Sequence, residues 1–291
     1  MKFDLTAASL FVIGNPIHHS VSPRMHQAVI DELGLDLQYS ALRIPSEVDL
    51  AAFFDAMKHG GIKGVNVTVP YKEAVLPHLD HLDDAAKRCG AVNTIVNQDG
   101  RLIGYNTDGL GLLKSIKEDL GKEVFGQKVV IIGAGGAARG IVDALCQSGI
   151  ASCAILNRTL SKAETLRYDM ESVYKNPFYV GSTDVQEGSL EWTWLNDADI
   201  VIQSTSVGLS PNDHDTPVKT ISWLRPGQLC IDIIYKPLET VFLKQAIAAG
   251  AIPLNGVGML AGQGAAAFEL FTGRPANYHL MKKEILNVDR Y

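Results

Sequence analysis

Short apolar runs alternate with amphipathic stretches along most of the chain. Residues 10–14 and 64–69 have the length and the β-branched content of strands. The run 128–133 is almost continuously apolar, which is typical of a parallel strand that is buried on both faces. Because strand and helix signals alternate, the pattern predicts an α/β fold with mainly parallel sheets. The expected strands are 10–14, 39–44, 64–69, 93–97, 102–106, 128–133, 153–156, 178–180, 199–205 and 229–235.

The clearest helix start in the first hundred residues is at Ser22. Serine is a favoured N-cap residue, Pro23 fits the first helical position, and Gly34 suits the left-handed residue that follows a helix. Capping alone would explain Ser22. Ser20 has no such structural task, so a ligand-binding role is more open for it.

The stretch 64–72 alternates apolar and polar residues. Its three valines are expected to face one side of a strand, and Asn66 and Thr68 the other side. Pro70 cannot donate a hydrogen bond to a sheet, so the strand is expected to end there. Lys72 then lies just beyond a strand end, where α/β enzymes place catalytic groups. The alternative is an edge strand followed by an ordinary surface lysine.

A hairpin is predicted over residues 91–109. Asp99 and Gly100 are favoured turn residues, and counting back from them places Thr94 opposite Tyr105. Polar residues should therefore gather at the open end of the hairpin, although Asp108 also suits a cap of the following helix. The residues expected at this open end are Asn93, Asn106, Thr107 and Asp108.

A glycine turn follows the apolar strand that ends near residue 133. Gly133, Gly135 and Ala138 fit the pattern G-x-G-x-x-G/A between a strand and a helix. Gly133 permits the tight turn, and Gly135 lets the backbone approach a pyrophosphate at the helix N-terminus. The alternative is a plain turn without a ligand. The context of strand, turn and helix, with a further strand about 20 residues on, favours a dinucleotide site.

The residues after the second strand of this unit indicate which dinucleotide binds. Enzymes that use NAD place an acidic residue there to accept from the ribose 2′-hydroxyl. Here Leu156 is followed by Asn157, Arg158 and Thr159, and Lys162 comes one turn later. A guanidinium suits a 2′-phosphate, so NADP is predicted. The alternative is a polar loop in which Thr159 only caps the next helix.

Composition and charge exclude several classes of protein. The 291 residues allow one large or two medium domains, and the formal net charge of −6 argues against nucleic-acid binding. No apolar run approaches the ~18 residues of a membrane helix, and the N-terminus does not resemble a signal peptide. Four scattered cysteines predict reduced thiols in the cytoplasm. The histidines at 18, 19 and 26 lack acidic neighbours at ligand spacing, so no metal is predicted.

Eight motifs in order along nearly the whole chain resemble the shikimate dehydrogenase family, including its quinate/shikimate dehydrogenase relatives. They read SVSPRMH, NVTVPYK, GAVNT, NTDG, GAGGAARG, NRTLSK, DIIYKP and NGVGMLAGQGAAAFE. The resemblance implies a substrate domain over 1–110, completed by C-terminal helices at about 250–291. It implies a Rossmann-type NADP-binding domain over 111–249, and a cleft between the two α/β domains. Tyr71, where many relatives have Phe, and the loop STSVGLSP depart from the pattern.

The same resemblance implies a function in the pathway to chorismate and the aromatic amino acids. The reaction would be the reversible, NADP-dependent reduction of 3-dehydroshikimate to shikimate by a cytoplasmic monomer or homodimer, with Lys72 and Asp108 as the catalytic pair. The residues implied for substrate binding are Ser20, Ser22, Asn66, Thr68, Asn93, Tyr235 and Gln263. The residues implied for cofactor binding are Gly133, Ala134, Gly135, Gly136, Ala137, Asn157, Arg158, Thr159, Lys162 and Gly256.

Three alternatives remain beside this reading. A quinate/shikimate dehydrogenase would act on quinate and possibly use NAD. A sensor without turnover would be expected to have lost Lys72 or Asp108, and both are present. A dehydrogenase of the methylene-tetrahydrofolate type would have no reason to carry Ser20, Ser22 and Gln263.

Overall fold

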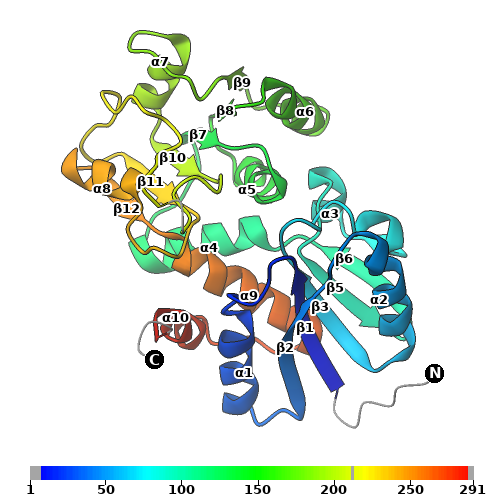
Figure 1. Cartoon of the computed structure of the whole chain (residues 1–291). Helices are drawn as coiled ribbons and strands as arrows, with labels where there is room; N and C mark the ends of the chain where they lie inside the picture. The colour runs from blue at the N-terminus through cyan, green and yellow to red at the C-terminus, as the bar shows by residue number, and fades with distance from the viewer. Residues whose placement is uncertain (1–7, 211–212, 288–291) are drawn as a thin grey trace. The chain divides into compact units, whose positions relative to one another are not determined.

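The computed structural model describes residues 8–210 and 213–287, and the chain divides into two compact units (Figure 1). The first unit is Met1–Gly111 with Ala261–Tyr291, and the second is Leu112–Leu260. The first border lies beside the expected one at 110/111. The chain returns to the first unit at 260/261 rather than at 249/250, because residues 252–254 form a strand that pairs within the second unit.

The first unit is built on a six-stranded sheet in the order β2-β1-β3-β5-β6-β4. Strands β2, β1 and β3 are parallel, whereas β5 runs antiparallel to both β3 and β6. The strands are β1 (Ala8–Gly14), β2 (Leu37–Arg43), β3 (Ile62–Val67), β4 (His81–Leu82), β5 (Thr94–Gln98) and β6 (Arg101–Tyr105). The helical segments are α1 (Ser22–Glu32), α2 (Val48–His59), η1 (Leu76–His78), α3 (Asp84–Cys89), the C-terminal part of α9 (Gly256–Thr272) and α10 (Tyr278–Leu286).

Helices cover both faces of this sheet. Phe53, Phe54 and Met57 of α2 pack with strand residues such as Val65 and Ile95 in one apolar core. Helix α1 packs against β2 and α10, and Figure 1 shows it on the side of the sheet away from α2. Val65 and Val67 face the core with α2, as the alternation predicted, whereas Asn66 on the opposite face is buried as well.

The hairpin β5–β6 has the predicted turn and register. Asp99 and Gly100 have φ values of 52° and 86°, which fit a two-residue turn with positive φ at both central positions. Thr94 pairs with Tyr105, so the residues beyond the pair lie together at the open end.

Two local predictions in the first unit are wrong. Ser22 is the first residue of α1 rather than its N-cap, because Val21 holds that position and makes no side-chain cap. The hydroxyl of Ser20 accepts the Ser22 N–H at 3.3 Å instead. Strand β3 ends at Val67, two residues earlier than expected, and the side chain of Val69 is 68% exposed instead of facing the core.

The second unit is a doubly wound parallel sheet in the order β12-β11-β10-β7-β8-β9. This order is the one typical of Rossmann-type folds, with a switch point between β7 and β10. The strands are β7 (Lys128–Ile132), β8 (Ser152–Leu156), β9 (Phe178–Gly181), β10 (Ile200–Gln203), β11 (Leu229–Asp232) and β12 (Ile252–Leu254). The helices are α4 (Asp108–Leu120), most of which belongs to this unit, α5 (Gly136–Gln147), α6 (Leu160–Glu171), α7 (Leu190–Asp197) and α8 (Val241–Ala248).

Alternate residues of the central strands enter two separate cores. Val129 and Ile131 pack with α5 and α6, whereas Val130 and Ile132 pack with α7 and α8. Because both faces are covered, nearly every position of β7 is apolar, which explains why the strand shows no alternation in the sequence. Among the helices of the described residues, none has the length and apolar character needed to cross a membrane.

Candidate active site

Lys72 and Asp108 form a largely buried ion pair in the first unit. Lys72 follows β3, and Asp108 is the first residue of α4. The Lys72 Nζ lies 2.5 Å from Asp108 Oδ2, and the two side chains are only 16% and 6% exposed. The alternative of an ordinary surface lysine is therefore wrong. Because removing one partner of a buried pair leaves the other charge unpaired, each side chain depends on the other.

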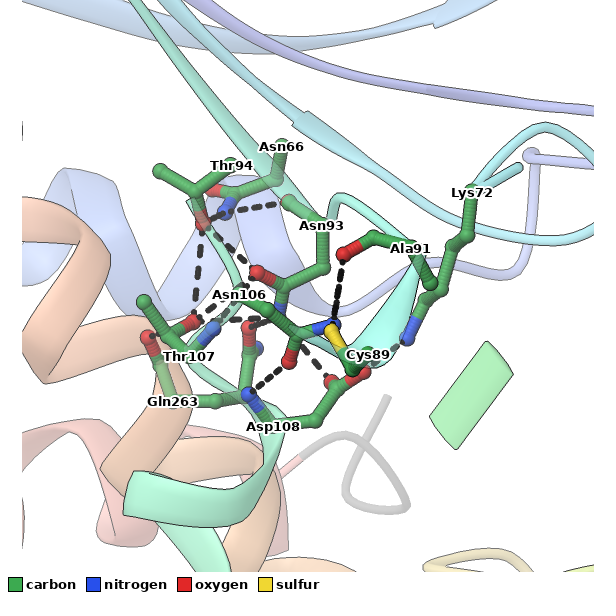
Figure 2. A network of polar contacts seen from close by, with 10 residues as sticks. All are labelled: Asn66, Lys72, Cys89, Ala91, Asn93, Thr94, Asn106, Thr107, Asp108 and Gln263. Carbon is green, nitrogen blue, oxygen red and sulfur yellow. Dashed lines mark hydrogen bonds and ion pairs between the residues drawn. The ribbon is translucent and has the colours of Figure 1, made fainter. Parts of the chain in front are cut away.

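Asn93 holds the second oxygen of the Asp108 carboxylate (Figure 2). The Asn93 Nδ2 donates to Asp108 Oδ1 at 3.0 Å. The backbone N–H of Thr107 donates to Asn93 Oδ1 at 2.8 Å, and since an N–H can only donate, this contact fixes which way the Asn93 amide faces. Both carboxylate oxygens of Asp108 thus face hydrogen-bond donors.

The rest of the hairpin's open end supports the same carboxylate. Asn106 Oδ1 accepts the Asp108 N–H at 3.1 Å, so Asn106 rather than Asp108 satisfies this N–H at the start of α4. The side chain of Asp108 points instead toward Lys72 and Asn93 (Figure 2). The predicted gathering of the four polar residues is confirmed, and the reading of Asp108 as a cap is wrong.

Gln263 reaches this cluster from α9. Its Oε1 lies 3.4 Å from Asn93 Nδ2, and its backbone oxygen accepts from the Thr107 hydroxyl at 3.2 Å. Residues separated by some 170 positions in the chain therefore meet at one place in the first unit. The helix motif that contains Gln263 is what marked it in the sequence.

The other polar residues of the first unit differ in how much of their hydrogen-bonding capacity is used. Within the described residues, the side-chain hydroxyls of Ser22 and Thr68 have no hydrogen-bond partner, and Ser20 holds only the Ser22 N–H. The Asn66 amide is instead fully engaged. Its Oδ1 accepts from the Tyr39 hydroxyl at 2.7 Å, and its Nδ2 donates to Asn93 O and Thr94 Oγ1 at 3.3 and 3.1 Å.

Sequence reasoning did not single out Tyr39 as part of this cluster, and it considered Thr94 only for its register in the hairpin. Tyr39 lies on β2 and Thr94 at the start of β5, and both are buried. The strand period predicts that Tyr39 faces inward, but no local pattern shows which polar atom its hydroxyl meets.

The second unit contains the glycine turn between β7 and α5. Gly133 has a φ of +117°, and a Cβ there would lie 2.5 Å from the Ser204 hydroxyl oxygen. Gly135 is the N-cap of α5 without a side-chain cap, and a Cβ at this position would meet nothing within 4 Å. Ala134, Gly136 and Ala137 complete the turn. Open backbone N–H groups at the start of a helix fit a pyrophosphate.

The loop after β8 presents cationic side chains to solvent. β8 ends at Leu156 as predicted, and Arg158 and Lys162 are exposed. Among the described residues no hydrogen bond or ion pair engages the Arg158 guanidinium. Thr159 is the N-cap of α6, but its side chain makes no capping bond, and its carbonyl accepts from Asn157 Nδ2 at 2.7 Å. The loop therefore fits a phosphate group better than a cap.

Asp232 stabilises the segment that carries Tyr235 through two hydrogen bonds. Its Oδ1 accepts the Ile234 N–H at 3.0 Å, and its Oδ2 accepts the Thr240 hydroxyl at 2.6 Å. Burial raises the pKa of Asp232 to about 6 although both hydrogen bonds lower it, and burial also raises the pKa of Tyr235. A Cβ on Gly256 would lie 2.0 Å from the backbone oxygen of Ile233, so only glycine fits there.

Metal ligation has no support in the part of the chain that the structure describes. No group of three or more His, Cys, Asp or Glu side chains there is placed to hold an ion. His26 is fully buried, and the rings of His18 and His19 lie with centroids 3.8 Å apart and planes tilted by 51°.

Comparison with known proteins assigns the family. Three family models match: the shikimate dehydrogenase substrate binding domain at residues 12–95, shikimate / quinate 5-dehydrogenase at 115–233, and the shikimate 5'-dehydrogenase C-terminal domain at 256–286. Shikimate dehydrogenase (NADP(+)) of Geobacillus kaustophilus (strain HTA426) is 42% identical over 280 residues, which cover 96% of this chain and 98% of that protein. The chain belongs to the shikimate dehydrogenase family.

Solved structures of shikimate dehydrogenase and of a quinate dehydrogenase share this fold. A shikimate dehydrogenase in complex with NADP+ is 37% identical, has a TM-score of 0.89, and the match covers 98% of this chain and 96% of that chain. Quinate dehydrogenase from Corynebacterium glutamicum, in complex with NAD, is 30% identical with a TM-score of 0.87 and coverage of 97% and 99%. The fold predicted from the sequence, with a Rossmann-type unit, is thus confirmed.

The buried Asp232 leads to a prediction about stability and pH. Its folded pKa of about 6 lies above the ordinary value of 3.8, so between these pH values the folded state binds more protons than the unfolded state. The free energy of unfolding of the wild type, relative to Asp232→Asn, should therefore fall by about 1–3 kcal/mol as the pH rises from about 4 to about 6.5. It should then stay constant. Urea unfolding of both proteins over this range measures the difference, and a difference independent of pH would contradict the assignment.

Proposed function

We propose that this protein catalyses the reversible, NADP-dependent reduction of 3-dehydroshikimate to shikimate. The observation that carries the proposal is the buried pair of Lys72 and Asp108, whose carboxylate is held on its other side by Asn93. A Rossmann-type unit with Arg158 in place of an acidic residue supports NADP as the cofactor. Relatives named shikimate dehydrogenase (NADP(+)) at 39–42% identity support the same reaction.

Lys72 is suited to the proton transfer of this reaction. NADPH, when bound, supplies the hydride. As the carbonyl carbon is reduced, negative charge develops on its oxygen, and an ammonium group beside that oxygen stabilises the charge and donates the proton that completes the hydroxyl. Asp108 holds the Lys72 Nζ at 2.5 Å and thereby orients it. In the oxidative direction the pair takes the proton back, and we treat the two residues as one unit.

We propose substrate contacts for the residues that the resemblance implies. The hydroxyls of Ser20 and Ser22, together with Tyr235, are proposed to donate to the substrate carboxylate. Thr68, Asn93 and Gln263 are proposed to contact the ring hydroxyls. Asn66 is also proposed to contact a ring hydroxyl, although its two N–H groups, like those of Asn93, are directed at protein acceptors.

The cofactor contacts follow from the second unit. The turn from Gly133 to Ala137 is proposed to hold the pyrophosphate, and Gly256 to lie near the nicotinamide. Arg158, whose guanidinium has no partner among the described residues, is proposed to bind the 2′-phosphate. Asn157, Thr159 and Lys162 are proposed to assist Arg158.

A second candidate function is the oxidation of quinate. The similarity to a quinate dehydrogenase in complex with NAD favours it. The absence of an acidic residue at positions 157–159 speaks against an NAD-linked version, but it does not discriminate between quinate and shikimate. We further propose a cytoplasmic monomer or homodimer, and the four buried free cysteines support the cytoplasm.

The proposed function predicts one dominant activity among four. Initial oxidation rates with shikimate or quinate, each with NADP+ or NAD+, should be highest for shikimate with NADP+. Dominant turnover of quinate with NAD+ would contradict both the substrate and the cofactor assignment.

Replacing the catalytic lysine should abolish most turnover. Lys72→Ala is expected to lower kcat on the order of a hundredfold or more, with a smaller change in shikimate binding, because proton transfer is lost. Lys58→Ala is the matched control, since Lys58 forms an ion pair with Asp80 at 3.1 Å in the same unit. Steady-state kinetics and shikimate binding by calorimetry measure both effects, and turnover of Lys72→Ala close to that of the control would refute the role.

Replacing the proposed phosphate-binding arginine should act on one cofactor only. Arg158→Ala is expected to raise the KM for NADP+ about 10- to 100-fold and to leave that for NAD+ nearly unchanged, because a charge-assisted contact to the phosphate is lost. Arg167→Ala is the control, because Arg167 lies on the adjacent helix α6 and pairs only with Glu171 at 3.4 Å among the contacts found. An equal loss for both cofactors would show that Arg158 has a structural role.

A further inference from the structure

Tyr39 donates the first bond of a buried polar chain in the first unit. Its hydroxyl lies 2.7 Å from Asn66 Oδ1. A carbonyl oxygen can only accept, so the direction of this bond is fixed by chemistry. Tyr39 lies on β2 and Asn66 on β3, two strands that are not hydrogen-bonded to each other because β1 lies between them.

Asn66 continues the hydrogen-bonded chain to the hairpin with the same donor-to-acceptor direction. Its Nδ2 donates to the backbone oxygen of Asn93 at 3.3 Å, and since that oxygen cannot donate, the amide cannot face the other way. The second hydrogen is directed at Thr94 Oγ1 at 3.1 Å. A flipped amide would place two carbonyl oxygens against each other and leave the Tyr39 hydroxyl facing an N–H group.

Thr94 and Asn93 complete the chain to the carboxylate (Figure 2). The Thr94 hydroxyl donates to Asn93 Oδ1 at 3.1 Å, and Asn93 Nδ2 donates to Asp108 Oδ1 at 3.0 Å. Each donor from Tyr39 to Asn93 therefore points toward Asp108. Hydrogen bonds aligned in one direction polarise one another, so the last donor is strengthened by those before it.

The Tyr39 end of this polar chain is buried, and neither Tyr39 nor the neighbouring His26 changes its charge in the ordinary pH range. Tyr39, Asn66, Asn93 and Thr94 are each at most 5% exposed. His26 of α1 stacks on the Tyr39 ring, with centroids 4.2 Å apart and planes at 4°. Burial lowers the pKa of His26 to about 3 and raises that of Tyr39 well above its usual range.

No charged group other than the ion pair contacts this chain among the described residues. Phe268 and Phe271 of α9 are the further rings beside His26, and neither carries a charge. At the Asp108 end of the polar chain, Lys72 is the only charged side chain among the described residues that contacts Asp108.

We propose that Tyr39 is a positioning residue for the reaction, acting on Asp108 through Asn66, Thr94 and Asn93. The inference rests on the proposed roles of Lys72 and Asp108. The chain holds the carboxylate in place as an acceptor and so keeps it ready to orient the Lys72 ammonium.

Two substitutions break the chain at different points. Tyr39→Phe removes the first donor, and Thr94→Val removes a middle donor while keeping the shape of the side chain. Each is expected to lower kcat about three- to tenfold and to move the acid limb of the kcat–pH profile to higher pH, because the carboxylate loses part of its stabilisation. The KM for NADP+ should change less than twofold. The double variant should be little worse than either single one, because both act on one chain.

Two controls separate positioning from stability. Tyr71→Phe removes another buried tyrosine hydroxyl, which donates to Ile44 O at 2.8 Å outside the chain, and it should lower the melting temperature without moving the profile. Thr94→Ser keeps a hydroxyl at the middle position and should recover most of the kcat that Thr94→Val loses. If Tyr39→Phe fails to fold, the kcat values and pH profiles of Thr94→Val and Thr94→Ser are sufficient to test the positioning role.

The outcomes distinguish this inference from the proposed function. Suppose that Tyr39→Phe and Thr94→Val both keep the kcat and the acid limb of the wild type while Lys72→Ala is inactive. That result would refute the positioning role of Tyr39 but not the proposed function. An equal shift of the profile in Tyr71→Phe, or strictly additive losses in the double variant, would also refute the positioning role. An active Lys72→Ala would refute the function itself.

Discussion

The burial of one carboxylate, that of Asp108, is the constraint on which the polar architecture of the first unit depends. A charged carboxylate that is only 6% exposed is costly unless each oxygen has a donor. Lys72 supplies one donor and Asn93 the other, and the start of α4 adds the favourable end of a helix dipole. The hairpin, the residue after β3 and the helix start must therefore meet within hydrogen-bonding distance, which leaves little freedom in how these elements join.

The two units share a layered α/β fold but differ in the directions of their strands. The second unit buries both faces of a fully parallel sheet, and it leaves polar chemistry to the turns at the carboxyl ends of β7 and β8. The first unit inserts an antiparallel hairpin into its sheet. That change of direction brings the open end of the hairpin, with Asn93 and Asp108, beside the residues that follow β3. If β5 ran parallel to β3, its first residues and Asn93 would lie at the opposite edge of the sheet from the residues that follow β3.

Local patterns predicted the parts of this structure that depend on neighbours in the sequence. The turn at Asp99 and Gly100 sets the register, and simple counting then places Asn93 near Asp108. The prediction failed at one helix start and where a distant contact decided the outcome. Ser22 follows the sequence rules for a cap, yet Val21 takes that position, and β12 extends the second unit because β11 offers it an open edge. Tyr39 and Asn66 are 27 residues apart, and no motif records that they meet.

The residues of the site divide according to how much of their hydrogen-bonding capacity the protein itself uses. Asn66 and Asn93 have each of their N–H groups directed at a protein acceptor, so their main effect is to fix the geometry of others. Lys72 differs, because its ammonium has three N–H groups and, among the described residues, Asp108 is its one hydrogen-bond partner. Two donors on an oriented cation therefore stay available for a substrate oxygen. The Asp108 carboxylate has a donor at each oxygen, which is consistent with the proposed role of Lys72 as the group that exchanges a proton with a ligand.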